Sequence, residues 1–165
     1  MTQDLTATPL TAADFAPFGE VITPRPAPDM IINAGRCGRH HDLARMDFGT
    51  GRAGISLFDA EARHWPVSID LLERHPLGSQ AFIPITGTPF LVVVAADADG
   101  IPATPRAFLT APGQGINLHR NVWHAVLTPI GAPGLYAVVD RIGAGNNLEE
   151  YYFKAPFLVN SPVCG

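Results

Sequence analysis

The feature that most limits the fold of this chain is the recurrence of short, β-rich runs between turn-forming residues. Glycine and proline number 16 each in 165 residues and are spread along the chain, and almost no stretch keeps a helical period. The runs that we predict as strands are 54–61, 67–75, 79–85, 90–96, 106–111, 115–119, 125–130 and 134–142. Eight short strands separated by turns indicate a mainly β protein, an antiparallel barrel or sandwich, with few short helices.

Two segments carry the marks of helix ends. Residues 11–19 suit one helical turn, with Thr11 as the N-cap and Asp14 in the place of the usual capping-box Glu. The second segment is 146–153, where either of two asparagines could cap a first turn that contains two glutamates. We therefore predict one short helix at each of these places.

The run "FLVVVAA" at 90–96 does not alternate between apolar and polar residues. A continuous apolar strand is buried on both faces, so its second face needs a cover. That cover is either another sheet or a second subunit, and on this ground we expect a homodimer.

Length and composition bound the remaining classes. We expect one domain over 1–165, without nucleic-acid partners because the net charge is −4 and basic residues form no block. The N-terminus lacks the pattern of a signal peptide, and 90–96 is too short to cross a bilayer, so no membrane partner is expected. Cys37 and Cys164 are read as free thiols, which favours a reducing cytoplasm.

A first polar cluster lies in "LLERHPLGSQAFIPITG" (71–87). Side chains alternate along a strand, so Glu73 and His75 share one face and Arg74 points to the other. If the strands on either side of the turn pair with each other, Gln80 joins this face. Burying such groups without partners costs a few kcal/mol each, so we expect them to line a pocket and bind a ligand or one another.

A second polar cluster lies in "GQGINLHRNVWH" (113–124). Asn117 and His119 share a strand face, and Trp123 and His124 follow after a short irregular stretch. The histidines could equally be ordinary residues of a barrel mouth, and Trp123 could be a pocket wall or a dimer contact.

The spacing of both clusters is similar to the two cupin motifs. The first motif, G-x5-H-x-H-x3–4-E-x6-G, is matched by Glu73-x-His75-x4-Gln80-x6-Gly87, and the second is echoed around His119. On this reading the four metal-ligand positions are Glu73, His75, Gln80 and His119. A mixed set of oxygen and nitrogen donors suits Ni²⁺, Mn²⁺ or Fe²⁺ better than a structural zinc site.

A fuller resemblance covers nearly the whole chain, from about Phe15 to Glu150. The strings "IINAGRCGRHHDLA" (31–44), "ERHPLGSQAFIP" (73–84), "GQGINLHRNVWH" (113–124) and "VVDRIGAGNNLEE" (138–150) resemble the ureidoglycolate lyase family. The chain departs from the family pattern at His40, Ala125 and Ile142. The resemblance implies a cupin β-barrel, usually a homodimer associated with nickel and with no organic cofactor. It also implies cleavage of (S)-ureidoglycolate to glyoxylate and urea, in the allantoin branch of purine breakdown.

The residue types suit this chemistry. Cleavage needs a base for the hydroxyl proton, an acid for the departing urea nitrogen and a cation for the carboxylate. The expected catalytic residues are Glu73, His75, His119 and His124, and the expected substrate-binding residues are Gln80, Asn117, Trp123 and Arg141. Glu73 is either the base or a metal ligand, and Arg120 is an alternative to Arg141.

Three alternatives stay open at this point. The chain could be an amidohydrolase that releases ammonia from the same substrate, or another cupin enzyme such as an isomerase or dioxygenase. It could instead be a non-catalytic cupin that binds small carboxylates. His41 and Asp42 could reach the site from an N-terminal arm, or across a dimer.

Overall fold

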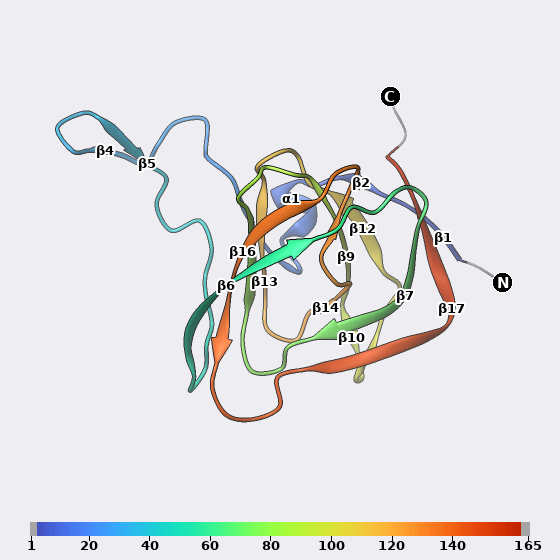
Figure 1. The fold of residues 1–165 in the computed structure, drawn as a ribbon. Coiled ribbons are helices and arrows are strands. Elements are labelled where there is room, and N and C mark those ends of the chain that lie inside the picture. The colour runs from blue at the N-terminus through green and yellow to red at the C-terminus, as the bar shows by residue number, and fades with distance from the viewer. Residues whose placement is uncertain (1–2, 163–165) are drawn as a thin grey trace.

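The computed structural model describes residues 3–162 and consists of two facing β-sheets with one short helix (Figure 1). The first sheet contains, in spatial order, β1 (Gln3–Thr6), β17 (Glu149–Asn160), β7 (Val67–Arg74), β14 (Trp123–His124), β9 (Phe90–Ala95), β12 (Arg106–Leu109) and β2 (Thr8–Pro9), with β15 (Thr128–Pro129) also paired to β9. The second contains β3 (Gly19–Ile22), β13 (Gly115–Leu118), β8 (Gln80–Pro84), β16 (Gly134–Ile142) and β6 (Arg52–Ala60). Together they form a nearly closed barrel, which confirms the predicted mainly β, cupin-type fold.

Two small ribbons and the helix complete the fold. Strands β4 (Met30–Ile32) and β5 (Cys37–Arg39) form a hairpin that projects from the body (Figure 1). Strands β10 (Asp97–Ala98) and β11 (Ile101–Pro102) form the second ribbon. Helix α1 (Ala12–Phe15) begins after Thr11, whose side chain accepts a hydrogen bond from the Asp14 backbone N–H, as predicted. In residues 3–162, no helix is long and apolar enough to span a bilayer.

The continuous apolar strand β9 is buried on both faces, as its sequence predicted. Phe90, Val92 and Val94 face the core between the two sheets. Leu91 and Val93 lie in a second core that the chain's own strands β7, β14 and β17 enclose. The cover therefore comes from within the chain, and β9 no longer supplies a reason to expect a second subunit.

The predicted helix over 146–153 is wrong, because that segment enters β17. Residues Glu149–Tyr152 pair antiparallel with residues 71–74 of β7, and exposure alternates along the strand. Tyr151 and Phe153 pack against the second core. Pairing and burial thus override the capping pattern of the sequence.

The strands on either side of the 75–79 turn do not pair, so the condition under which the sequence placed Gln80 on the face of Glu73 and His75 is not met. Strand β7 pairs with β17 and β14, whereas β8 pairs with β13 and β16. The turn therefore carries the chain from one sheet to the other. As a consequence, side chains of β7 and β8 approach one another across the barrel rather than side by side in one sheet.

Candidate active site

Three side chains that can bind a metal or move a proton converge on the inner face of the first sheet. Glu73 lies near the end of β7, His75 follows the strand, and His124 of β14 is the direct cross-strand partner of Glu73. The His75 Nε2 lies 3.9 Å from the Glu73 Oε1, and the centroids of the two imidazole rings are 5.2 Å apart. One donor atom from each residue lies within 4.8 Å of the other two.

The contacts that Arg74 makes on the opposite face of β7 explain why Glu73 points inward. Arg74 points away from the site, as predicted, and forms ion pairs with Asp97 and Glu149. Its guanidinium also lies 4.4 Å from the centroid of the Trp123 ring. Because neighbouring residues of a strand face opposite sides, these contacts fix the direction of Glu73.

Backbone carbonyls fix the tautomer of both histidines. The His75 Nδ1 lies 2.7 Å from the Asn147 carbonyl oxygen, and the His124 Nδ1 lies 3.1 Å from that of Ala125. A carbonyl only accepts hydrogen bonds, so each Nδ1 carries the proton. A ring with its proton on Nδ1 keeps a lone pair on Nε2, and both Nε2 atoms are buried without a hydrogen-bond partner among residues 3–162. Such outer hydrogen bonds are typical of metal-binding histidines.

Burial shifts the pKa of two residues of the cluster, Glu73 and His124. It raises the pKa of Glu73, to which the Glu150 carboxylate adds, whereas His75 opposes the shift. It also lowers the pKa of His124 to about 3, with a further contribution from His75. His124 is thus neutral near pH 7 and can donate a lone pair, but it cannot supply a proton as an imidazolium.

This donor set fits a divalent metal ion. It offers one carboxylate and two imidazole nitrogens whose lone pairs have no other partner. Gln80 approaches from the facing sheet: its Oε1 is also buried without a partner, and its Nε2 donates to Asp140 Oδ2 at 3.2 Å. Glu73 and Gln80 line one hollow of about 370 Å³, together with Phe58, Asp59, Ala60, Phe82, Val126 and Leu127.

His119, expected among the metal ligands, lies elsewhere, and His124 occupies the place beside Glu73 and His75. The residues of β13 that face the core are Ile116 and Leu118, so Asn117 and His119 point to the outer face of the second sheet. There Glu20 binds both of them, at 2.8 Å from the Asn117 Nδ2 and from the His119 Nε2. The ligand set expected from the cupin spacing is corrected accordingly.

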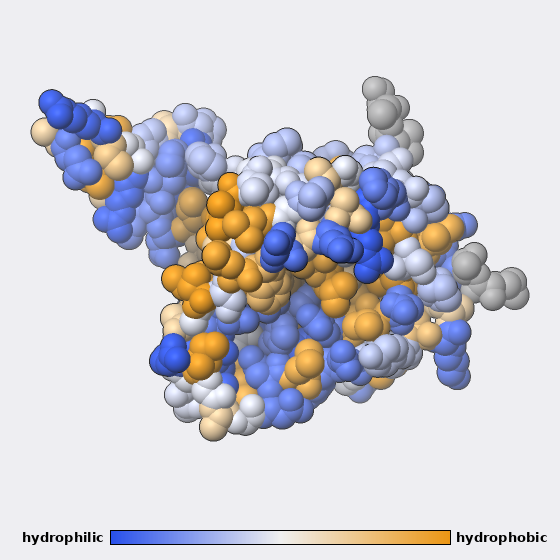
Figure 2. Space-filling view, viewed as in Figure 1, coloured by the Kyte–Doolittle hydropathy of each residue, from blue (hydrophilic) through white to orange (hydrophobic). Residues whose placement is uncertain are grey.

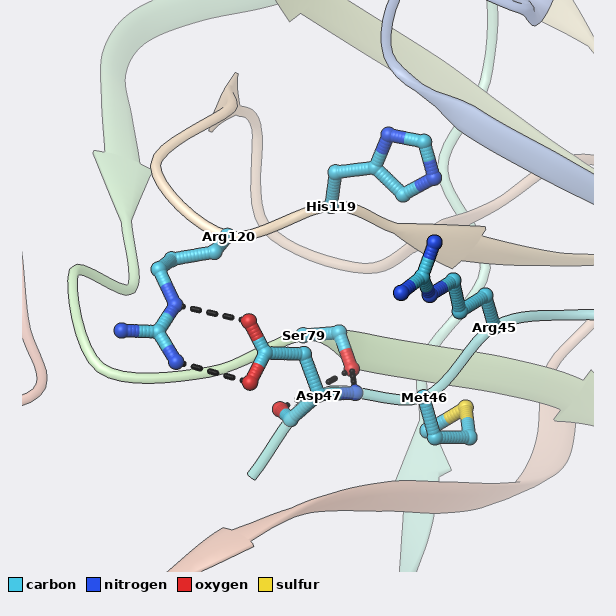
Figure 3. Close-up of a pocket in the computed structure, with 6 residues that line it drawn as sticks. All are labelled: Arg45, Met46, Asp47, Ser79, His119 and Arg120. Carbon is cyan, nitrogen blue, oxygen red and sulfur yellow. Dashed lines mark hydrogen bonds and ion pairs between the residues drawn. The ribbon is translucent and has the colours of Figure 1, made fainter. Parts of the chain in front are cut away.

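His119 borders a separate hollow of about 510 Å³, lined also by Arg45, Met46, Asp47, Ser79 and Arg120. Figure 3 shows the Arg120 guanidinium bound to the Asp47 carboxylate through two hydrogen bonds, while His119 projects away from this pair. Although this hollow is the larger, it lacks the convergent, partnerless donor atoms of the Glu73 site. We therefore assign the chemistry to the Glu73 site.

Two other predicted binding residues do not reach the Glu73 hollow. Trp123 faces the second core on the side of β14 opposite His124, and its indole N–H donates to Asp97. Arg141 donates to the Ala144 carbonyl and follows Asp140, so the two side chains leave β16 on opposite faces. Of the predicted residues, the structure brings together Glu73, His75, Gln80 and His124.

Two supporting residues were not among the predicted site residues. Asn147 holds His75 through its carbonyl, and its Oδ1 accepts a hydrogen bond from the Leu77 backbone N–H at 2.7 Å. Asp140 holds the Gln80 amide. Both lie in the string "VVDRIGAGNNLEE", which signalled their importance but not their partners.

Comparisons with known proteins agree on one family. The model of the family described as ureidoglycolate lyase matches residues 2–160. The ureidoglycolate lyase of Rhodobacter capsulatus is 68% identical over 92% of this chain and 94% of its own length. Ureidoglycolate lyase 2 of Rhizobium meliloti is 52% identical over the same shares of the two chains. A dTDP sugar isomerase from Desulfovibrio desulfuricans shares the fold, with a TM-score of 0.51, 16% identity and 84% coverage of each chain.

The raised pKa of Glu73 gives a testable effect on stability. Above the unfolded-state value of 4.5, the unfolded chain loses this proton more readily than the folded one. The free energy of unfolding therefore falls as the pH rises through the folded-state pKa. In metal-free buffer at pH 7.5 we expect Glu73→Gln to raise the unfolding temperature by roughly 2–4 °C. Circular dichroism melts should show this gain disappearing near pH 4.5; a gain that is equal at all pH values would contradict the explanation.

Proposed function

This chain belongs to the ureidoglycolate lyase family, and we propose that it cleaves (S)-ureidoglycolate to glyoxylate and urea as a lyase. The observation that carries this proposal is the buried convergence of Glu73, His75 and His124 beside the amide of Gln80. The substrate is a small hemiaminal with a carboxylate, and its cleavage needs one proton acceptor and a hydrogen-bonding group for the ureido part. The Glu73 hollow supplies both.

Glu73 is proposed as the group that moves the proton. Its carboxylate takes the proton of the substrate hydroxyl, the carbonyl of glyoxylate forms, and the C–N bond breaks with its electron pair on the urea nitrogen. The same carboxyl group then returns the proton to that nitrogen, so the reaction balances without another reactant. A pKa raised by burial suits a group that must both accept and donate a proton near neutrality.

The surrounding residues hold the reacting groups in place. The Gln80 Oε1 has no partner and accepts a hydrogen bond from the ureido N–H groups, while Asp140 keeps the amide oriented. The Nε2 atoms of His75 and His124 would hold a divalent ion, for which we propose nickel from the family resemblance, and the Glu73 carboxylate beside them is left to move the proton. When bound, such an ion would supply a Lewis acid that stabilises the negative charge on the oxygen of the forming carbonyl.

We further propose that the enzyme is a homodimer. The outer face of β6, β16 and β8 exposes Ile55, Leu57 and Ile83, and the register places Ala137 and Val139 between them. Ile55 is 76% and Leu57 63% exposed. Apolar residues gather on this side of the body in Figure 2. A continuous apolar face of this kind marks an interface, and a second copy of the chain is the partner that fits it best.

A cytoplasmic location and a single domain complete the proposal. Cys37 is exposed and has no disulfide partner within residues 3–162, and free thiols persist in reducing compartments. Cys164 lies outside the described residues.

The first prediction tests the reaction. The wild-type protein should release urea and no ammonia from (S)-ureidoglycolate. Glu73→Gln should lower kcat about 10²- to 10⁴-fold, because the proton acceptor is lost. Asp70→Asn removes an exposed carboxylate from the same strand and should retain full activity. Separate assays of the two products decide the outcome: ammonia would mean an amidohydrolase, and neither product a binding protein.

The second prediction tests the corrected ligand set. After metal removal and dialysis against Ni²⁺, we expect about one ion per wild-type chain, and affinity lower by about 10-fold or more in His75→Ala and His124→Ala. His119→Ala should bind nickel as the wild type does, because Glu20 holds that imidazole elsewhere. Elemental analysis of the dialysed proteins measures this. Loss of nickel in His119→Ala with retention in His124→Ala would restore the set expected from the cupin spacing.

The third prediction tests the interface. Leu57→Lys places a charge in the middle of the apolar face and should convert a dimer into a monomer at micromolar concentration. Ile101→Lys alters an exposed apolar residue of β11 and should leave the dimer intact. Light scattering coupled to gel filtration gives both masses. A wild-type monomer, or a Leu57→Lys dimer, would rule out this interface.

A further inference from the structure

The Glu73 hollow lacks a cation for the carboxylate of the substrate. In residues 3–162, none of the residues that line it is an arginine or a lysine, and its charged members, Glu73 and Asp59, are acidic. Arg74, next to Glu73, and Arg141, next to Asp140, are engaged elsewhere, Arg74 with two carboxylates and Arg141 with a backbone carbonyl. On the proposed function, which this inference deepens, the site of one chain is incomplete.

An unengaged arginine lies at the tip of the β4–β5 hairpin, which we call the arm. The arm projects away from both sheets (Figure 1). Its tip turns through Asn33, Ala34 and Gly35, which have φ values of 53°, 54° and 87°. Arg36 follows this turn, is exposed, and makes no side-chain hydrogen bond or ion pair within the described part of the chain. Its guanidinium is therefore free to bind a carboxylate.

The arm exposes apolar residues, whereas its base is fixed to the rest of the chain by an ion pair and a hydrogen bond. Ile31 is 60% exposed and Met30 41%, and a two-stranded hairpin with uncovered apolar residues is not stable alone. Yet its base is fixed: Asp29 forms an ion pair with Arg25 and accepts a hydrogen bond from the His41 backbone N–H at 2.7 Å. An arm that is already ordered loses little entropy when it docks.

The rim of the hollow and the apolar face meet on the same strand. Strand β6 contributes Ile55 and Leu57 to the proposed interface, and Phe58, Asp59 and Ala60 to the hollow. A partner that packs on β6 therefore lies next to the rim. The arm also leaves the body on the side on which this apolar face lies (Figures 1 and 2). A two-fold dimer formed through the proposed face would place each arm beside the other subunit.

From these observations we propose that the arm of one subunit docks at the rim of the partner's hollow, where its Arg36 binds the substrate carboxylate. The acidic lining of the hollow complements the basic tip of the arm. Arg36 is thus a substrate-binding residue that acts between subunits. Each active site then consists of residues from two chains.

Activity gives the first test. Arg36→Ala should raise KM about 10- to 100-fold, with a smaller change in kcat, because a charge-assisted hydrogen bond to the substrate is lost. Arg106→Ala, an exposed arginine that binds Asp14 instead, should leave KM unchanged. An unchanged KM in Arg36→Ala would overturn the proposal.

Mixed dimers then separate action within a subunit from action between subunits. A dimer purified with one Glu73→Gln chain and one Arg36→Ala chain contains one intact site that receives an intact arm. At subsaturating substrate, it should recover roughly half of the wild-type rate, although each parent dimer is impaired. A mixed dimer no faster than the average of its parents would show that the arm does not serve its partner.

A crosslink tests the docking independently of any activity. In a Cys37→Ser, Cys164→Ser background, chains with Arg36→Cys should form a disulfide with differently tagged chains that carry Asp59→Cys. Replacing Asp59→Cys by Asp4→Cys, in an exposed strand of the other sheet, should give no such product. A crosslink without urea release would leave the docking intact and reject the proposed reaction; urea release without a crosslink would do the reverse.

Discussion

Strand β9 has no face towards solvent, and the geometry of the site depends on that burial. Its inner residues meet the core between the sheets, and its outer residues meet the core that the first sheet encloses. Between β9 and β7 there is room for the two-residue strand β14, which pairs with both. This pairing sets His124 opposite Glu73, so the packing of an apolar strand positions the reactive groups.

Burying polar atoms without hydrogen-bond partners lowers the stability of the fold, and several such atoms lie together in the Glu73 site. The Nε2 atoms of His75 and His124 and the Oε1 of Gln80 have no hydrogen-bond partner, while Glu73 is partly desolvated. Elsewhere, ion pairs of the same chain are well matched, as in Arg120 with Asp47. Of the five buried side-chain atoms without a hydrogen-bond partner in the described residues, three lie in this site, which supports its proposed function because donor atoms left free are available to a ligand.

Local pattern was sufficient for much of the fold and for the inner face of β7. The alternation of side chains correctly directed Glu73 and His75 to one side and Arg74 to the other, and the continuous run of β9 correctly indicated burial on both faces. The sequence pattern gave wrong predictions where pairing between strands distant in the sequence determines the structure. The two glutamates that suit a first helical turn lie instead in β17, which pairs antiparallel with β7, and the asparagines before them begin no helix. His119 and His124 could not be distinguished, since only the pairing of β14 shows which one meets Glu73.

The crossing of the chain between the two sheets at 75–79 has a consequence for selectivity. Glu73 and Gln80 stand on opposite walls, and so the distance between them is the distance between two sheets. A Cβ added at Gly78 would lie 2.8 Å from the Asp47 carbonyl oxygen and 2.9 Å from the Arg141 Cβ, so the close packing at this crossing leaves no space for a side chain at position 78. The packing of the two sheets thus sets the distance between the wall that carries Glu73 and the wall that carries Gln80. On the proposed function, the space open to the substrate therefore depends on packing at this crossing as well as on the residues that line the hollow.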